Sequence, residues 1–246
     1  LTNEWRWSER FASQPELLRY CNYVADKFDL RRDAKFDTRV ISALFDEETN
    51  LWTVRTDKGD VVSAPYCIMA TGSLSTPYKP PYPGIEDFGG EWHHTGTWPH
   101  EEVSFTGKRV GIIGTGSTGI QAIPVIAREA AHLTVFQRTP QYTTPARNRP
   151  MTSGEQEAFN ARRDQWRKEV KQTFNAITDF SPPTKFFHEN TPEERRTYLE
   201  SRWEIGGMPQ ALMETYKNIG VDEAANSVVA DFVRDKIREI VKDSEV

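Results

Sequence analysis

The stretch that decides the fold reads Lys108-Arg109-Val110-Gly111-Ile112-Ile113-Gly114-Thr115-Gly116-Ser117-Thr118-Gly119-Ile120-Gln121. Its apolar run, residues 110–113, predicts a buried parallel strand. Glycines at 114, 116 and 119 then follow the G-x-G-x-x-G spacing and lead into an apolar helical pattern. A glycine triplet alone is a weak indication, but one placed between a strand and a helix predicts a Rossmann-like dinucleotide-binding site.

Each glycine has its own role in such a loop. Gly114 makes the tight turn, Gly116 lets the backbone approach a pyrophosphate, and Gly119 lets the helix pack closely on the strand. Amides at the helix N-terminus face the phosphates, where the helix dipole favours negative charge. We therefore expect an anionic ligand at this loop.

The end of the following strand indicates which dinucleotide binds. An acidic residue there suits the ribose hydroxyl of NAD, whereas an arginine suits the 2′-phosphate of NADP. The sequence reads Phe136-Gln137-Arg138-Thr139-Pro140 at this point and contains no carboxylate. Arg138 offers a planar, permanently charged fork to a phosphate, although a solvated surface arginine is the alternative. Together with the glycine loop, it favours NADP over NAD.

Composition limits the classes of protein to consider. The chain has 246 residues, 37% of them hydrophobic and 27% charged, with a net charge of −5. These values are typical of a soluble globular protein and give no reason to expect a nucleic-acid partner. No apolar run approaches the roughly 20 residues that a membrane span requires. Cys21 and Cys67 form no C-x-x-C pair, so we expect reduced thiols, a cytoplasmic location and no metal site.

Around the glycine loop the pattern predicts an α/β protein. Before it, we expect a helix over residues 15–28, with a capping box at Ser13 and Glu16. Three short strands over residues 39–46, 52–56 and 60–64 are predicted to form an antiparallel meander, a fourth strand follows over residues 66–70, and residues 73–84 form a proline-rich linker. The strand–helix–strand unit covers residues 108–113, 117–130 and 133–137, and helical segments follow over residues 154–176, 192–216 and 224–242, with interruptions at Pro182-Pro183 and Gly206-Gly207. Because the chain begins with Leu1 and already reads as the middle of a structure, we expect an internal fragment of a longer polypeptide.

A second dense motif precedes the loop, over residues 87–99. Its adjacent residues His93 and His94 cannot both face one way on an extended chain, and no cluster of further ligands follows at metal-binding spacing. From these residues alone, a loop with one hydrogen-bonded core histidine is the plainer interpretation.

This second motif resembles the fingerprint of Baeyer–Villiger monooxygenases. That fingerprint is Phe, one residue, Gly, three residues, His, three residues, Trp, then Pro or Asp, and it is met here by Phe88, Gly90, His94, Trp98 and Pro99. The final aromatic is typically Phe or Tyr in related N-hydroxylating and flavin-containing monooxygenases, so Trp98 favours the Baeyer–Villiger branch. The glycine loop follows at the interval seen in this family, and the resemblance extends over essentially the whole chain. For Phe88 and Trp98, simple packing of the loop stays an alternative.

The resemblance implies an FAD- and NADPH-dependent enzyme similar to cyclohexanone monooxygenase. Such enzymes use NADPH and O2 to insert an oxygen atom next to a ketone carbonyl, giving an ester or lactone. It further implies that residues 1–82, with the predicted helix and meander, belong to an FAD-binding domain, 83–150 to a Rossmann-like NADP-binding domain, and 151–246 to its helical extension.

The resemblance also implies roles for individual residues. The pyrophosphate would lie on the glycine loop, and the 2′-phosphate on Arg138 and Thr139, while His94 would help couple the two domains rather than donate a proton. The loop residues are Gly114, Thr115, Gly116, Ser117, Thr118, Gly119, Ile120 and Gln121.

The family's FAD fingerprint and active-site arginine have no match in this sequence, so we expect the isolated chain to be inactive and to need the remainder of an FAD domain. Two other classes stay open. One is a flavoprotein monooxygenase that oxidises nitrogen or sulfur, and the other is an NADP-binding module without activity. A pyridine-nucleotide disulfide reductase fits poorly, because no redox-active cysteine pair is present.

Overall fold

A computed structural model describes residues 4–140, 142–173, 183–207 and 215–242 of this mixed α/β protein. The chain divides into two compact units. One consists of Lys35–Gln141, and the other joins Leu1–Ala34 to Tyr142–Val246. None of the described helices is long and apolar enough to cross a membrane.

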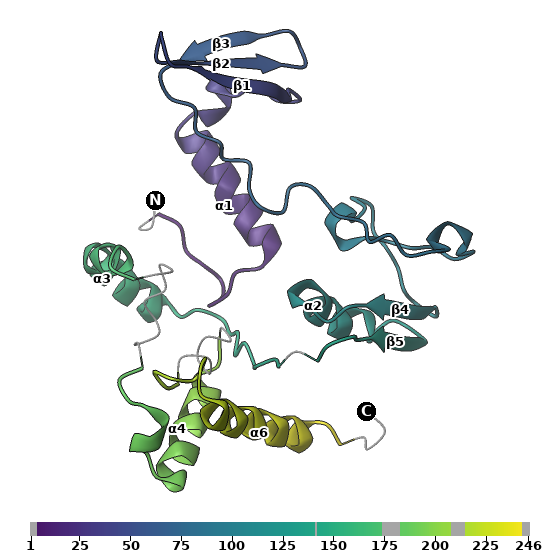
Figure 1. The fold of residues 1–246 in the computed structure, drawn as a ribbon, viewed down its shortest axis with the longest axis vertical. Coiled ribbons are helices and arrows are strands. Elements are labelled where there is room, and N and C mark those ends of the chain that lie inside the picture. The colour runs from purple at the N-terminus through teal and green to yellow at the C-terminus, as the bar shows by residue number, and fades with distance from the viewer. Residues whose placement is uncertain (1–3, 141, 174–182, 208–214, 243–246) are drawn as a thin grey trace. The chain divides into compact units, whose positions relative to one another are not determined.

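The N-terminal part of Lys35–Gln141 forms an antiparallel meander of three strands. These strands, drawn in Figure 1, are β1 (Val40–Asp46), β2 (Leu51–Thr56) and β3 (Val61–Ala64), in the order β1-β2-β3. Asn50 and Gly59 make the connecting turns with φ of 56° and 86°. The predicted meander is therefore confirmed.

The strand predicted over residues 66–70 is wrong, because this stretch has no regular structure. It has no neighbouring strand within the described chain, and Tyr66 and Ile68 are 84% and 89% exposed. A strand exists only when its amides and carbonyls pair with a neighbour, and local sequence cannot supply that neighbour.

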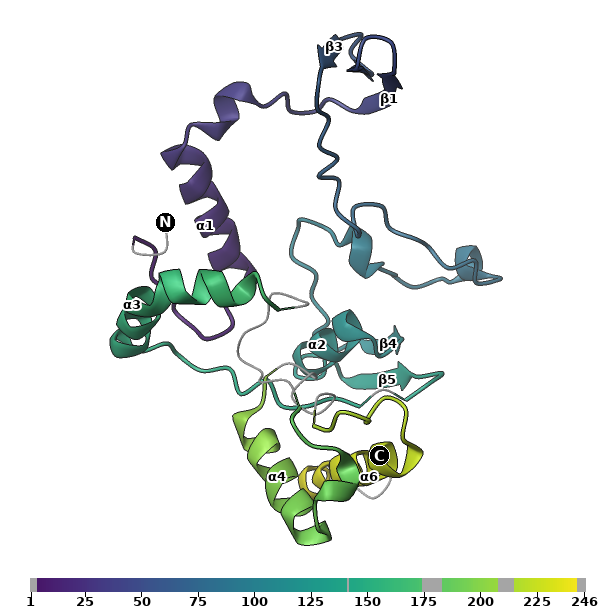
Figure 2. The ribbon, with the colours of Figure 1, turned by 60° about the vertical axis from the view of Figure 1, so that its left-hand side comes forward.

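The strand–helix–strand unit around the glycine loop is present. It consists of β4 (Arg109–Ile113), α2 (Ser117–Ile126) and β5 (His132–Phe136), which lie together in Figures 1 and 2. The two strands pair in parallel, with Arg109 opposite His132 and Ile113 opposite Phe136. This register brings the carboxyl ends of both strands to the same edge.

Helix α2 is shorter than predicted, since it ends at Ile126 rather than residue 130. Pro124 lies inside it and has no backbone N–H to donate. The following residues turn sharply, with the Ala130 amide donating to Ile126, and the Ala131 amide then donates to Lys108 at 2.9 Å as β5 begins. The end of the helix is therefore set by the short return to the second strand.

The other unit is largely helical. Its helices are α1 (Gln14–Lys27), α3 (Ser153–Val170), α4 (Pro192–Ile205) and α6 (Glu223–Ile240). Helices α4 and α6 lie together in Figures 1 and 2 and bury an apolar core of Phe187, Leu199, Trp203, Tyr216, Ala225, Val229, Phe232 and Val233. Single 3-10 turns occur in the chain at Leu30–Asp33, Ile85–Asp87, Thr95–Thr97 and Phe187–Glu189.

The four predicted helices of this unit are present, but two are shorter than expected. Helix α3 ends at Val170, and residues 174–176 of the prediction lie outside the described residues, as does Pro182. Helix α4 ends before Gly206 and Gly207, which have φ of 61° and 99°, and residues 208–214 also lie outside the described residues. The glycine pair therefore ends the helix, in agreement with the interruption predicted at Gly206-Gly207.

The capping box expected at Ser13 and Glu16 is wrong. Ser13 is the N-cap of α1 but makes no side-chain cap, whereas the Glu16 carboxylate accepts hydrogen bonds from the amide and hydroxyl of Ser8 at 2.9 and 2.6 Å. The Ser8 hydroxyl also lowers the pKa of Glu16 below its usual range. The carboxylate thus fixes the N-terminal segment against α1.

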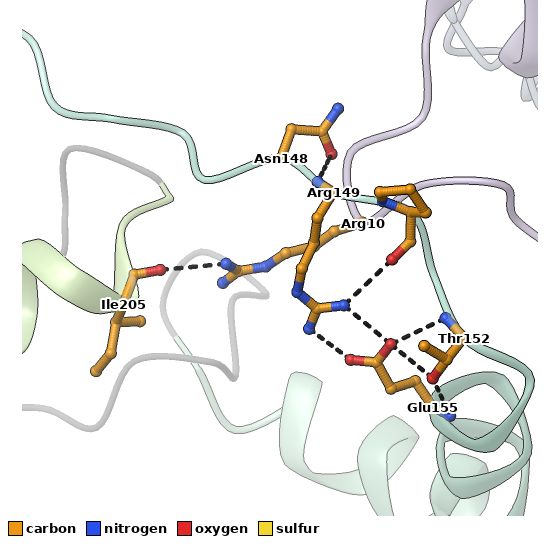
Figure 3. A network of polar contacts seen from close by, with 7 residues as sticks. Arg10, Asn148, Arg149, Thr152, Glu155 and Ile205 are labelled. Atoms are coloured by element: carbon orange, nitrogen blue, oxygen red, sulfur yellow. Dashed lines mark hydrogen bonds and ion pairs between the residues drawn. The ribbon is translucent and has the colours of Figure 1, made fainter.

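Residues 8–10 also pair with residues 149–151, far along the sequence. Glu9 forms an isolated antiparallel bridge with Pro150, and the Arg10 amide donates to Arg149 at 2.9 Å. Figure 3 shows Arg149 reaching Glu155 at the start of α3, while Arg10 donates to the carbonyl of Ile205 at 3.2 Å. This network explains why the N-terminal segment and the helices belong to one compact unit.

Candidate nucleotide-binding site

The glycine loop connects the carboxyl end of β4 to the N-terminus of α2. Gly114 has φ of 97°, a conformation that favours glycine, and its amide donates to Phe136 at 2.9 Å. Gly116 is the N-cap of α2 in extended conformation, and it accepts from the Ile120 amide. The backbone therefore turns away from the sheet and enters the helix within three residues.

Two of the glycines differ in what surrounds them. A Cβ on Gly119 would lie 2.4 Å from the carbonyl oxygen of Gly114, so only glycine allows this approach of helix to loop. A Cβ on Gly116 would have no atom within 4 Å. Gly119 is thus required by packing within the chain, while the space beside Gly116 is open to a ligand.

The N-terminus of α2 carries no competing anion. Its first turn contains no acidic residue, and the N-cap has no side chain to accept from the free amides. Backbone amides at a helix N-terminus that lack partners attract anions, and the helix dipole adds to this attraction. The side chain of Gln121 turns back on its own helix, donating to the Ser117 carbonyl at 2.8 Å.

The segment after β5 lies beside the glycine loop. The side-chain amide of Gln137 donates to the Thr115 hydroxyl at 2.8 Å, next to the backbone bond from Gly114 to Phe136. Arg138 and Thr139 follow and are both exposed. Within the described part of the chain, Arg138 has no hydrogen bond or ion pair, so its guanidinium is free to meet an anion.

The fingerprint residues Phe88 and Gly90 form a local contact. A Cβ on Gly90 would lie 2.8 Å from atoms of the Phe88 ring, which explains glycine two residues after an aromatic. Phe88 is nevertheless 60% exposed. The spacing of these two residues therefore has a packing reason, while most of the ring surface stays accessible.

His94 is half-buried and caps the 3-10 turn Thr95–Thr97. Its Nδ1 accepts from the Gly96 amide at 3.1 Å. His93 instead faces Trp98, with ring centroids 5.5 Å apart, and Trp98 also lies 6.2 Å from Phe105. The adjacent histidines therefore have different surroundings, and no group of three or more metal-binding side chains occurs among the described residues.

An ion pair joins the fingerprint segment, residues 87–99, to the residue that precedes β4. Glu91 accepts from Lys108 at 2.6 Å, and this partner lowers the pKa of Glu91 below its usual range. Lys108 precedes β4, whereas the glycine loop follows that strand. Among the described residues, no hydrogen bond or ion pair joins the fingerprint residues directly to the loop, and Pro99 is half-buried without such a bond.

The structure thus groups the predicted site residues into two sets. The loop, the start of α2 and Arg138 share one edge of the β4–β5 pair, held by contacts that include Gln137. The fingerprint residues form the other set, around the Thr95–Thr97 turn. Gln137 was not predicted as a site residue, because its partner Thr115 lies 22 positions earlier in the sequence.

The chain matches the family model for pyridine nucleotide-disulphide oxidoreductases over residues 2–203. It belongs to this family. Its two cysteines, Cys21 and Cys67, are free thiols.

Two curated relatives are monooxygenases. The Baeyer–Villiger monooxygenase of Pseudooceanicola batsensis is 43% identical over 100% of this chain, which covers 45% of that relative. The acetone monooxygenase (methyl acetate-forming) of Gordonia sp. is 42% identical over 98% of this chain, with the same 45% covered. The chain therefore spans somewhat less than half the length of these relatives.

A solved structure agrees with them. Cyclohexanone monooxygenase from Rhodococcus sp. Phi1, bound to NADP+, superposes with a TM-score of 0.89 at 43% identity. The match covers 99% of this chain and 45% of that protein. The resemblance to Baeyer–Villiger monooxygenases is therefore confirmed in both sequence and fold.

Proposed function

We propose that this chain forms the NADPH-binding part of a flavin-dependent Baeyer–Villiger monooxygenase. The similarity over the whole chain to an enzyme of that name carries the proposal. Formation of methyl acetate from acetone, which names the second relative, is the insertion of one oxygen atom between a ketone carbonyl and its neighbouring carbon. The proposed reaction is therefore conversion of a ketone, O2, NADPH and a proton to an ester or lactone, NADP+ and water.

The described residues fit a bound dinucleotide. Open space beside Gly116 and free amides at the N-terminus of α2 suit a pyrophosphate, which the segment from Thr115 to Gln121 would hold. Arg138, without a partner in the described chain, and Thr139 would hold the 2′-phosphate. When bound, NADPH supplies a hydride and FAD the site where O2 is activated, while the protein binds and orients them.

His94 has a proposed coupling role within the fingerprint, which consists of Phe88, Gly90, His94, Trp98 and Pro99. Because Nδ1 of His94 accepts from Gly96, a neutral imidazole carries its proton on Nε2, which can donate to a neighbouring group. His94 would in this way link the nucleotide domain to the FAD domain. No proton transfer to the substrate is assigned to it.

The remaining assignments follow the resemblance. Residues 1–82 are proposed as part of an FAD-binding domain, 83–150 as a Rossmann-like NADP-binding domain and 151–246 as its helical extension. These functional boundaries differ from the compact units, which follow contacts such as the one between Glu9 and Pro150. No residue of the chain is assigned to FAD contact, and the rest of the FAD domain is a proposed partner. The free thiols of Cys21 and Cys67 support a cytoplasmic location.

The reaction can be tested with isotopic oxygen. The full-length polypeptide that contains this chain, supplied with FAD, NADPH and cyclohexanone under ¹⁸O2, is expected to yield a lactone that carries a single ¹⁸O atom. NADPH oxidation should match lactone formation, because each turnover uses one hydride donor. Mass spectrometry of the lactone and absorbance of NADPH are the measurements.

Other outcomes support the other classes. An amine converted to its N-oxide, with no ester or lactone from any ketone, would indicate a nitrogen-oxygenating enzyme. Binding of NADPH without oxidation would indicate a nucleotide-binding module. Sulfoxide formation does not discriminate, because flavin monooxygenases of both kinds can oxidise sulfur.

A further inference from the structure

We propose that Gln137 is a positioning residue that sets the preference for NADPH over NADH. It lies between β5 and Arg138, and its side-chain Nε2 donates to the Thr115 hydroxyl oxygen at 2.8 Å. The inference rests on the proposed function, because it requires a dinucleotide on the glycine loop and its 2′-phosphate on Arg138.

Two hydrogen bonds join the end of β5 to the glycine loop, and they differ in kind. The bond from Gly114 to Phe136 is between backbone groups, so it is set by the loop conformation itself. The bond from Gln137 to Thr115 is between side chains and holds the first residue beyond the strand. Only the second can be removed by substitution without altering the backbone path.

Beyond Phe136 the strand pairing stops. Ile113 opposite Phe136 is the last pair of the register, and residues 137–139 have no regular structure. Among the described residues, the bond between Gln137 and Thr115 is the one hydrogen bond that holds this segment. The position of Arg138 relative to the loop therefore depends on that bond.

This dependence affects the two nucleotides differently. NADPH presents two anionic groups at once, a pyrophosphate for the loop and a 2′-phosphate for Arg138, whereas NADH presents only the first. If residues 137–139 are released, the loop keeps its own conformation, and Arg138 must be ordered when the ligand binds. The affinity for NADPH should fall more than that for NADH.

Three variants isolate the bond. Gln137→Leu removes the donor of the hydrogen bond, and Thr115→Val removes its acceptor at nearly constant shape. Thr115→Ser keeps the accepting hydroxyl group. The matched control is Gln165→Leu, which removes a similar exposed amide whose Nε2 donates to Glu169 at 2.9 Å within α3. Binding of NADPH and of NADH to each purified protein is measured by titration calorimetry, with circular dichroism to confirm folding.

Wild-type protein should prefer NADPH. Gln137→Leu and Thr115→Val should each lower the ratio of NADPH to NADH affinity about threefold to tenfold, the effect of one neutral hydrogen bond. Combining them should lower it no further, since both remove the same bond. Thr115→Ser and Gln165→Leu should keep the wild-type ratio.

These measurements distinguish a failure of the role proposed for Gln137 from a failure of the proposed function. An unchanged ratio in both Gln137→Leu and Thr115→Val would overturn the role of Gln137 and leave the proposed function intact. Wild-type protein that binds neither nucleotide would overturn both. A loss of equal size for NADPH and NADH would show that Gln137 supports the loop alone, and would likewise refute its role in preference.

Discussion

Gly119 lies directly against Gly114, so that a Cβ on Gly119 would come within 2.4 Å of the Gly114 carbonyl oxygen. Gly116, between them in sequence, has no atom within 4 Å of the corresponding position. The two glycines of one motif therefore differ in physical origin. Gly119 is required by the packing of α2 on the loop, and Gly116 leaves room for a ligand.

Gly119→Ala should destabilise the protein and abolish NADPH binding. The added methyl group meets a backbone oxygen, which cannot rotate away as a side chain can, so the loop or helix must shift. Overpacking of this kind costs about 1–3 kcal/mol. Thermal unfolding followed by circular dichroism measures it. The control Gly89→Ala, where a Cβ meets nothing within 4 Å, should unfold close to wild type; equal melting of the two variants would contradict the packing role.

Gly116→Val should separate folding from binding. Because Gly116 has φ of −68° and open space around it, valine fits the conformation and should leave the melting temperature within a few degrees of wild type. Its branched side chain would occupy the space proposed for the pyrophosphate, so NADPH binding should be lost. Calorimetric titration tests this, and wild-type affinity in the variant would show that the ligand does not approach Gly116.

Arg138→Ala should weaken NADPH more than NADH. A charge-assisted contact of an exposed guanidinium with a phosphate is worth on the order of 2 kcal/mol, a factor of about 30 in affinity. NADH lacks that phosphate and should bind nearly as before. Arg128→Ala, another exposed arginine of the same unit, is the control and should change neither affinity. Equal losses for the two nucleotides would refute the assignment of Arg138.

The strand, loop and helix around Gly114 could be predicted because their determinants are local. An apolar run, three glycines and an apolar helical pattern specify successive segments without reference to the rest of the chain. The helix end was harder to predict. Pro124 is compatible with several endings, and the turn after Ile126 depends on the position of β5.

Contacts between distant residues were beyond prediction. The carboxylate of Glu16 could serve either an N-cap three residues earlier or Ser8, and only the folded N-terminal segment favours Ser8. Likewise, no local pattern indicates that Glu9 pairs with Pro150, or Gln137 with Thr115. The predicted strand over residues 66–70 shows the converse, since a good local pattern forms no strand without a neighbour.

Gly206→Ala should destabilise the helical unit. Gly206 has φ of 61°, and a Cβ there would lie 2.2 Å from Cγ of Arg147 and 2.7 Å from the Pro145 carbonyl oxygen. With ψ of −159°, this backbone conformation is essentially restricted to glycine and costs another residue about 1–3 kcal/mol, and the contacts add to that cost. The control is Gly154→Ala in α3, where nothing lies within 4 Å and helix propensity favours alanine by up to about 1 kcal/mol. Urea unfolding should show opposite shifts, and a stabilised Gly206→Ala protein would contradict the close approach.

Glu155→Gln should remove part of the acid sensitivity of the protein. Hydrogen bonds from Arg149, and then from Thr152, lower the pKa of Glu155 from 4.5 to about 2 in the folded chain. Between these values the unfolded chain binds more protons than the folded one, so the stability that Glu155 contributes above about pH 4.5 is lost as the pH falls toward 2. Glutamine keeps the capping geometry with Thr152 but not the charge, so the variant should melt below wild type at pH 6 and approach it near pH 2.

Glu157→Gln, which removes a carboxylate without a hydrogen bond or ion pair among the described residues, should follow the wild-type pH profile. A constant difference between Glu155→Gln and wild type at every pH would show that the loss comes from shape rather than from charge.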